Sequence, residues 1–460
     1  MLSVLSSVGY FFLGGCLLNK AVVVGFYLMD HFNYKDNELY AEDIKVTDLA
    51  KQYGTPLYVY SKATLVRHLR AFEEALAAKD HLVCYAVKAN SSLALLSVIA
   101  QSGCGFDVVS KGELMRVIKA GGSPEKVIYS GVGKREDEIE FALSQNIKCL
   151  NIESESEMYK VEQVAERMGL VAPVALRVNP NVDAKTHPSI STGLKKNKFG
   201  IAFEDASRLY RYIAQSKHLN ASGIDCHIGS QMTSGGPIIE ATDKLISLYK
   251  ELLEIGIKID HIDIGGGLGV TYNDETPPSP YEYLAAVIAR LKDFDVAIYC
   301  EPGRAMVANA GILLTDVLYL KSNTERNFCI VDAAMGDLIR PALYNSWMNI
   351  IPALKRDKSD ALEGSDANGN RLYDVVGPIC ESDDFLGKDR HLNVREGDIL
   401  AVRGAGAYGS TMSSNYNSRP LCAEVLVDGS KAFVIRERQK EEDMWRDERM
   451  LENSTSHDFS

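Results

Sequence analysis

The stretch VCYAVKA, residues 83–89, begins as an apolar run and then contains a lysine. Its first residues are typical of a buried β-strand. Lys88 is not, because removing an ammonium group from water is costly and lysine is rarely fully buried. Either Lys88 reaches solvent beyond the end of the strand, or it has a chemical role there. The rest of the predicted fold bears on that choice.

Seven further strand-like runs follow this one, separated by amphipathic segments such as 157–167 and 238–253. They are 105–110, 126–130, 148–153, 174–180, 221–229, 261–267 and 297–303. Alternation of strand and helix indicates parallel pairing through right-handed crossovers. Eight such units over about 250 residues are typical of a closed (β/α)8 TIM-type barrel, the predicted α/β fold. An open doubly wound sheet is the alternative, but it does not require eight equal units.

After residue 304 the pattern changes to short β-like runs with Gly and Asp turns and little helix between them. This predicts a C-terminal antiparallel β-domain, with a polar surface loop over 357–370. The predicted organisation is an apolar extension over 1–28, strands joining the β-domain over 29–61, the barrel over 62–305, the β-domain over 306–447 and a disordered tail over 448–460.

The first 28 residues are apolar, with no charge before Lys20, and contain LGGC at 13–16. A lipoprotein signal lipidated at Cys16 is one interpretation, but it lacks a basic beginning. We favour a non-native extension from an upstream start codon, with Met29 as the true start. The single lysine also makes a membrane span marginal.

Composition excludes several classes of function. The formal charge of −12 argues against nucleic-acid binding, which needs clustered Lys and Arg. Nine scattered cysteines without a CxxC pair indicate reduced thiols and a cytoplasmic location. No HExxH motif or His/Cys cluster is present, so no metal site is expected.

Polar groups stand at the predicted strand ends, where reactive groups of such barrels lie. They are Lys88, Asp107, Ser130, Glu153, Asn179, His227, the GGGLG turn at 265–269 and Glu301. A partly desolvated pocket would lower the pKa of Lys88 and make its amine a nucleophile towards an aldehyde. The glycine turn suits a phosphate, although it could simply be a tight turn. Three features together suggest pyridoxal 5'-phosphate: the amine of Lys88, a glycine turn that suits a phosphate, and a histidine that can stack on a ring.

Eight ordered motifs carry a resemblance: YAVKAN, FDVVSKGEL, HIGSQ, DIGGGLG, EPGR, RPALY, CESDDF and GAGAYG. Over about residues 29–447 the chain resembles the diaminopimelate decarboxylases. These are fold-type III pyridoxal-phosphate enzymes with an alanine-racemase-like barrel and a C-terminal β-domain. The resemblance implies a carboxy-lyase that removes CO2 from the D-centre of meso-diaminopimelate and leaves L-lysine, the last step of lysine biosynthesis.

The resemblance also implies roles at the cofactor. Lys88 would form the Schiff base, and His227 would stack on the pyridine ring. Glu301 would pair with the pyridine nitrogen and keep it protonated, so that the ring accepts the electron pair left by CO2. Alanine racemases of this fold place an arginine there, so Glu301 favours decarboxylation. The other implied cofactor contacts are Asp107, Ser230, Gly265, Gly266, Gly267, Gly303, Arg304 and Tyr408.

At the substrate, Arg304, Arg340 and Tyr344 would bind the distal carboxylate, since arginine binds carboxylates bidentately. Tyr408 would contact both cofactor and substrate. The resemblance implies that Glu381 binds the distal ammonium and that Cys380 is a candidate acid for reprotonation. Both would reach the site from the partner subunit of a homodimer.

Two of these residues also have purely structural interpretations. Arg340 could form a surface ion pair, and Cys380 could be a small buried apolar side chain. For the whole chain, the rivals are a decarboxylase of ornithine, arginine or carboxynorspermidine, and a non-catalytic pyridoxal-phosphate protein. Ornithine decarboxylases commonly carry CDG where this chain has CES.

Overall fold

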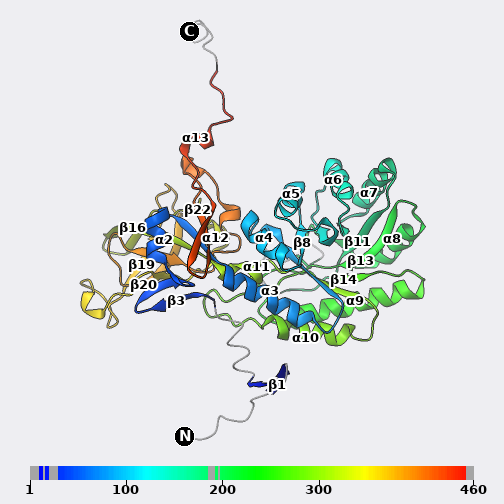
Figure 1. Ribbon diagram of the computed structural model, residues 1–460, viewed down its shortest axis with the longest axis horizontal. Helices are drawn as coiled ribbons and strands as arrows, with labels where there is room; N and C mark the ends of the chain where they lie inside the picture. Colours follow the sequence, from blue (N-terminus) through cyan, green and yellow to red (C-terminus); the bar gives the residue numbers. More distant parts are fainter. Residues whose placement is uncertain (1–9, 14–15, 20–29, 185–191, 195–196, 452–460) are drawn as a thin grey trace.

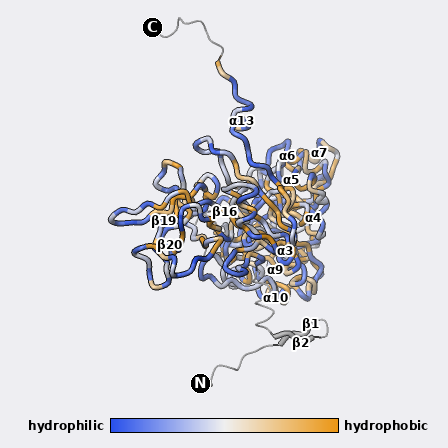
Figure 2. The backbone as a smooth tube through the Cα atoms, turned by 60° about the vertical axis from the view of Figure 1, so that its left-hand side comes forward, coloured by the Kyte–Doolittle hydropathy of each residue, from blue (hydrophilic) through white to orange (hydrophobic). Residues whose placement is uncertain are grey.

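The computed structural model describes residues 10–13, 16–19, 30–184, 192–194 and 197–451. Two bodies lie side by side, a helix-covered barrel on the right of Figure 1 and a β-rich body on the left. In Figure 2 the apolar chain lies mostly inside these bodies, whereas α13 and the outer loops are hydrophilic.

Eight parallel strands form the barrel. They are β7 (His81–Ala86), β8 (Gly105–Val108), β9 (Val127–Tyr129), β10 (Cys149–Ile152), β11 (Ala172–Asn179), β13 (Leu219–Asp225), β14 (His261–Asp263) and β15 (Ala297–Cys300). Hydrogen bonding follows the order β10-β9-β8-β7-β15-β14-β13-β11, and pairing of β10 with β11 closes the ring. The predicted (β/α)8 barrel is confirmed, because this closing pair excludes an open sheet. A short strand, β12 (Ile201–Ala202), pairs with β11 outside the ring.

Helices follow the barrel strands. They are α4 (Leu93–Gln101), α5 (Lys111–Lys119), α6 (Glu136–Ser144), α7 (Glu155–Met168), α8 (Phe203–Gln215), α9 (Gly236–Glu254), α10 (Pro280–Leu291) and the short α11 (Arg304–Val307), with α3 (Lys62–Leu76) before β7. Serine side chains cap several of them: Ser61, Ser110, Ser154 and Ser279 each accept a hydrogen bond from a backbone N–H of the first turn. These caps fix where each βα loop ends and its helix begins.

A second sheet builds the β-rich body. Its strands are β6 (Leu57–Ser61), β16 (Gly311–Ser322), β17 (Asn327–Val331), β18 (Ile350–Pro352), β19 (Arg371–Val376), β20 (Phe385–Leu392), β21 (Ile399–Val402), β22 (Ala423–Asp428) and β23 (Lys431–Arg436). Most pairs are antiparallel, as expected, but β17–β19 and β6–β22 are parallel, so the sheet is mixed. β6 comes from the N-terminal part of the chain and lies between β16 and β22.

The remaining described elements are small. Strands β3 (Phe32–Lys35), β4 (Glu38–Ala41) and β5 (Ile44–Lys45) form a three-stranded sheet, followed by α2 (Val46–Tyr53). Helices α12 (Arg340–Tyr344) and α13 (Glu441–Met444) lie in the C-terminal part. The side chains of β3, β4 and α2 share a core with β6 and β16.

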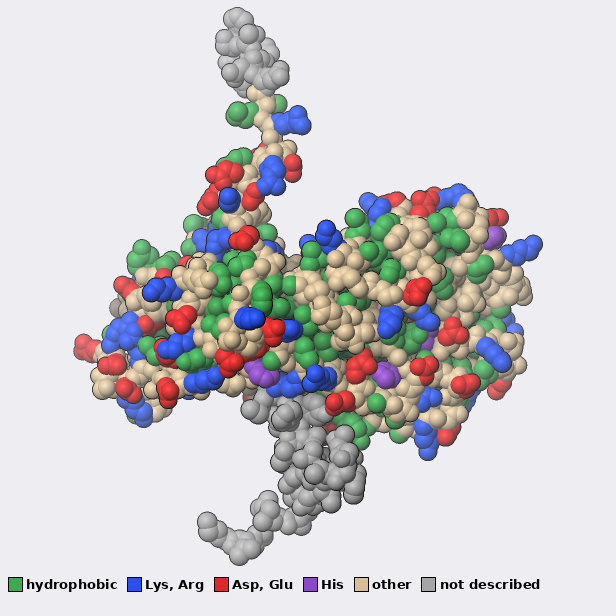
Figure 3. Space-filling model, viewed as in Figure 1, with side chains coloured by type: hydrophobic (Ala, Val, Ile, Leu, Met, Phe, Trp, Pro, Cys, Tyr) green, Lys and Arg blue, Asp and Glu red, His purple; other side chains and the backbone are tan. Residues whose placement is uncertain are grey.

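Most of the predicted N-terminal extension lies outside the described residues. Within it, β1 (Tyr10–Leu13) pairs antiparallel with β2 (Cys16–Asn19). Of the predicted disordered tail, residues 452–460 also lie outside them. Among the helices that are described, none is both long and apolar enough to cross a membrane. On the face shown in Figure 3, acidic and basic side chains are interspersed.

Candidate active site

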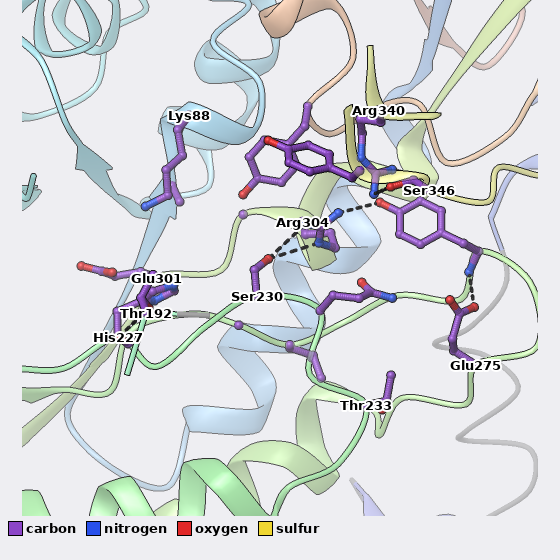
Figure 4. A pocket seen from close by; sticks show the side chains of 18 of the residues that line it. Lys88, Thr192, His227, Ser230, Thr233, Glu275, Glu301, Arg304, Arg340 and Ser346 are labelled. Carbon is purple, nitrogen blue, oxygen red and sulfur yellow. Dashed lines mark hydrogen bonds between the residues drawn. The ribbon is translucent and has the colours of Figure 1, made fainter. Parts of the chain in front are cut away.

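A cavity of about 480 Å³ lies at the C-terminal ends of the barrel strands, where residues of the β-rich body complete its wall. Ten of the predicted site residues line it: Lys88, His227, Ser230, Gly267, Glu301, Gly303, Arg304, Arg340, Tyr344 and Tyr408. Lys88, Glu301 and His227 gather at one end of it in Figure 4, and Arg340 lies at the other, with Ser230 and Arg304 between.

Lys88 lies in a single 3-10 turn, η1 (Val87–Ala89), immediately after β7. Its ammonium donates a hydrogen bond of 3.0 Å to the carboxylate of Asp107, which is fully buried at the end of β8. Burial disfavours the charged ammonium, but attraction to Asp107 and Glu301 exceeds that effect and raises the pKa of Lys88 above its usual value. The prediction that the pKa of Lys88 is lowered is therefore wrong, because it ignored the neighbouring carboxylates.

Glu301 belongs to a cluster of three buried carboxyl groups at the base of the cavity. Oxygens of Glu301, Asp225 and Asp263 lie within 4.8 Å of one another. Within the described chain, one oxygen of each has no hydrogen-bond partner. Burial, with repulsion from the neighbouring carboxylates, raises the pKa of Glu301 and Asp263 well above the usual range, and burial raises that of Asp225 to about 7. Like charges this close cannot all be ionised, so the cluster holds protons.

Arg177 neutralises part of this buried charge. Its guanidinium donates a hydrogen bond of 2.7 Å to Glu153 and lies 3.9 Å from the carboxylate of Asp225. Glu153 also accepts hydrogen bonds from the backbone N–H groups of Gly131 and Gly200. Arg177 thus links three barrel strands beneath the cavity.

Arg177→Met is expected to lower the free energy of unfolding by about 3–5 kcal/mol, because it leaves buried carboxylates without their cation. Urea unfolding of the purified protein measures this. Arg208→Met is the control, since Arg208 pairs with Glu155 on the surface and its loss should cause no measurable change. Equal effects of the two substitutions would contradict the assignment of Arg177 as the buried counter-ion.

His227 follows β13 and is held as a neutral imidazole. Its Nδ1 accepts a hydrogen bond of 3.1 Å from the N–H of Gly266. Burial and the positive charges of Lys88 and Arg177 lower its pKa well below the usual value. A neutral ring fixed at one nitrogen presents a flat face, as stacking on a pyridine would require.

The glycine turn after β14 differs in part from the prediction. The N–H of Gly265 donates to Asp263 and that of Gly266 to His227, so neither faces the cavity. Of the three glycines, Gly267 lines the cavity, and the implied cofactor contacts of Gly265 and Gly266 stay predictions. Small size is nevertheless required here, since a Cβ on Gly266 would lie 2.2 Å from the carbonyl oxygen of Glu301.

Two arginines enter the cavity without a carboxylate partner among the described residues. Arg304 donates to the hydroxyl of Ser230 at 3.1 Å and to the hydroxyl of Tyr272 at 2.9 Å. Arg340, at the start of α12, donates hydrogen bonds to two neutral acceptors, the sulfur of Met348 and the hydroxyl of Ser346. Both arginines are buried, and the surface ion pair considered for Arg340 is excluded. Buried guanidinium groups of this kind are suited to an anionic ligand.

The other predicted residues divide into two groups. Tyr408 lies over Arg304, with its ring centroid 4.9 Å from the guanidinium carbon, and Tyr344 lines the cavity at the end of α12. Cys380 and Glu381 do not line the cavity. Both are exposed, and Glu381 accepts a hydrogen bond from Tyr416. Cys380 is therefore not the buried apolar side chain of the alternative interpretation.

Several residues of the site were not predicted from the sequence. Tyr272 and Glu275 line the cavity from the loop after β14, five and eight residues beyond Gly267. Arg177, Asp225 and Asp263 form the buried charges below it. The sequence contains one indication of these buried charges: each of the three residues lies inside a strand made mostly of apolar residues, in LRVN, GIDC and HIDI. Such residues are rarely buried without a partner, so they pointed to one charged cluster.

Comparison with known proteins agrees with this geometry. Residues 62–308 match the family model described as pyridoxal-dependent decarboxylase, pyridoxal binding domain. The chain is 54% identical to the diaminopimelate decarboxylase of Vibrio cholerae, over 92% of this chain and 100% of that protein. It is 52% identical to that of Haemophilus influenzae, over 91% and 99%.

Solved structures give the same result. The diaminopimelate decarboxylase of Helicobacter pylori complexed with L-lysine is similar with a TM-score of 0.82 and 42% identity, over 87% of this chain and 98% of that one. The M. jannaschii enzyme in complex with L-lysine has a TM-score of 0.85 and 36% identity, over 92% and 98%. The chain therefore belongs to the diaminopimelate decarboxylase family of pyridoxal-dependent decarboxylases.

Proposed function

We propose that this protein decarboxylates meso-2,6-diaminopimelate at its D-centre and releases L-lysine and CO2, with pyridoxal 5'-phosphate as cofactor. The observation that carries the proposal is that the two ends of one cavity hold different charged groups. An amine beside a buried carboxyl cluster stands at one end, and two buried guanidinium groups without a carboxylate partner among the described residues stand at the other. Such a cavity suits a substrate with a reacting amino-acid centre and a second, distant carboxylate.

The residues present fit the cofactor. Lys88 offers an amine for its aldehyde carbon, and the neutral ring of His227 can stack on its pyridine. An oxygen of Glu301 is buried without a partner within the described chain, and it supplies the group that a pyridine nitrogen needs. Ser230, Gly267 and the segment 303–304 would hold the phosphate. When bound, the cofactor supplies an electron sink for the bond to the departing carboxylate.

This chain's own residues then set the course of the reaction. Arg304 and Arg340, with Tyr344, bind the distal carboxylate and so orient the D-centre towards the Lys88 end. Glu301 would share a proton with the pyridine nitrogen, because burial and the neighbouring carboxylates raise its pKa and favour a proton at this position. Lys88 or a second acid returns a proton to the carbon that loses CO2. Lys88 is close to the reacting end and, as an ammonium, carries a proton to give.

We further propose a homodimer in which Cys380 and Glu381 of one subunit complete the cavity of the other. Their exposure and their position outside the cavity of their own subunit support this arrangement. In the complete site, Cys380 is the candidate acid for the carbon and Glu381 accepts hydrogen bonds from the distal ammonium. The eight cysteines from Cys84 to Cys422 are unpaired, which supports the proposed cytoplasmic location.

Lysine release from purified protein with pyridoxal phosphate tests the function, with the meso, L,L and D,D isomers of diaminopimelate supplied separately. We expect turnover of the meso isomer and none of the L,L isomer, because the proposed reaction takes place at a D-centre and the L,L isomer has none. No turnover of any isomer by a cofactor-loaded protein would overturn the substrate assignment. Ornithine, arginine and carboxynorspermidine would then be the substrates to measure.

A further inference from the structure

We propose that Tyr272 is a positioning residue that holds Arg304 and Arg340 in the arrangement required for a distal carboxylate, and so selects substrates that carry one. The inference rests on the proposed function and assigns part of its substrate specificity to a side chain that does not itself bind the carboxylate.

The loop after β14 is built to fix Tyr272. The carboxylate of Glu275 accepts hydrogen bonds from the backbone N–H groups of Tyr272 (2.9 Å) and Asn273 (2.8 Å). The side-chain amide of Gln231 bonds both the N–H and the carbonyl of Val270. Behind the ring, a Cβ on Gly404 would lie 3.0 Å from the ring carbon Cε1, so the phenol rests against bare backbone. The ring therefore has little room to move away from the arginines.

Tyr272 contacts the two guanidinium groups in different ways. Its hydroxyl oxygen accepts a hydrogen bond of 2.9 Å from Arg304. The guanidinium carbon of Arg340 lies 4.5 Å from the centroid of its ring, within cation–π range. The guanidinium carbon of Arg304 lies 5.9 Å from the same centroid, so the ring faces both cations and the hydroxyl adds a hydrogen bond to Arg304.

The electrostatics agree with this role. Burial would raise the pKa of the Tyr272 phenol, yet that pKa lies below its usual value because Arg304 and Arg340 exceed the effect of burial. Burial and the charge of Arg304 lower the pKa of Arg340. The two buried cations therefore repel each other. Tyr272 supplies the partial negative charge of its oxygen and ring face, which keeps both guanidinium groups in place until a carboxylate binds.

Lysine enantiomers separate this role from a general structural one. L-Lysine carries the carboxylate that lay at the distal L-centre of the substrate, so it should use the arginine pair. D-Lysine equals meso-diaminopimelate without the distal carboxylate, and its carboxylate lies at the reacting end. The two ligands have the same mass and charge, so a substitution that weakens L-lysine more than D-lysine acts on the end that binds the distal carboxylate.

The experiment uses the holoenzyme and the variant Tyr272→Phe, which keeps the ring and removes the oxygen. Loss of one hydrogen bond to a charged group predicts an increase of about tenfold in KM for meso-diaminopimelate and in the inhibition constant of L-lysine. We expect kcat to stay within about twofold of the wild type, because the lost interaction binds the substrate equally well in the ground state and in the transition state. The inhibition constant of D-lysine should also stay within about twofold, because D-lysine has no distal carboxylate. Tyr249→Phe is the matched control, since that hydroxyl donates to Asp295 outside the cavity.

Two outcomes would overturn the inference: an unchanged KM in Tyr272→Phe, or an equal loss for both lysine enantiomers. If Tyr272→Phe does not fold, Glu275→Ala tests the same loop and should raise KM in the same direction. Failure of the proposed function is distinguishable, because the wild type itself would then release no lysine from meso-diaminopimelate.

Discussion

Lys88→Ala is expected to lower lysine-forming turnover by roughly 10³-fold or more, because the side chain is the proposed covalent attachment point for the cofactor. The wild type treated with borohydride should carry the reduced cofactor on the peptide that contains Lys88. Mass spectrometry of that peptide and steady-state kinetics measure the two effects separately.

Lys88→Arg is the matched variant for this experiment. It keeps a cation beside Asp107, so the barrel end retains its ion pair, but a guanidinium cannot form the covalent bond. We expect it to be as inactive as Lys88→Ala while being the more stable of the two in thermal unfolding. A borohydride-reducible adduct that persists in Lys88→Ala would show that another residue carries the cofactor.

The second large effect concerns the proposed sharing of the site between two subunits. Cys380→Ala is expected to lower turnover by about 10²- to 10⁴-fold, the usual range for loss of a general acid. The cavity of a subunit contains Lys88 but not its own Cys380, so the two substitutions should complement each other across a dimer. Random mixing of Lys88→Ala and Cys380→Ala subunits places one intact site in half of the dimers, which restores about a quarter of wild-type activity.

Complementation is measured after the two inactive proteins are unfolded together and refolded, with each protein refolded alone as the control. Recovery in the mixture alone would support shared sites. No recovery in mixed dimers would mean that each site is built within one subunit. Wild-type turnover by Cys380→Ala would identify another group as the acid that protonates the carbon.

The strand ends of the barrel were the most predictable part of the site. Parallel strands bring their carboxyl ends to one face, so Lys88, His227 and Glu301 converge although they are far apart in the sequence. Arg340 was found differently. It comes from the β-rich body, where no periodicity indicates which side chains face the barrel, and only the resemblance to a family singled it out.

Other features depend on spatial neighbours and could not be predicted in that way. The direction of the pKa shift at Lys88 is set by Asp107 and Glu301, which approach it from other strands. The N–H directions in the glycine turn depend on His227. Strand β18 shows no clear apolar alternation, and it is stabilised by pairing with β21, which is distant in the sequence.

The position of β6 has a consequence for how the protein is made. This strand leaves the ribosome before the whole barrel, yet its two neighbours, β16 and β22, are synthesised after it. A nascent chain must therefore keep residues 57–61 unpaired while the barrel forms, and the sheet is completed only near the end of translation. A gene fragment that encodes residues 306–447 alone lacks a central strand. A circular permutant that places residues 30–61 after residue 447 would supply that strand within one contiguous unit.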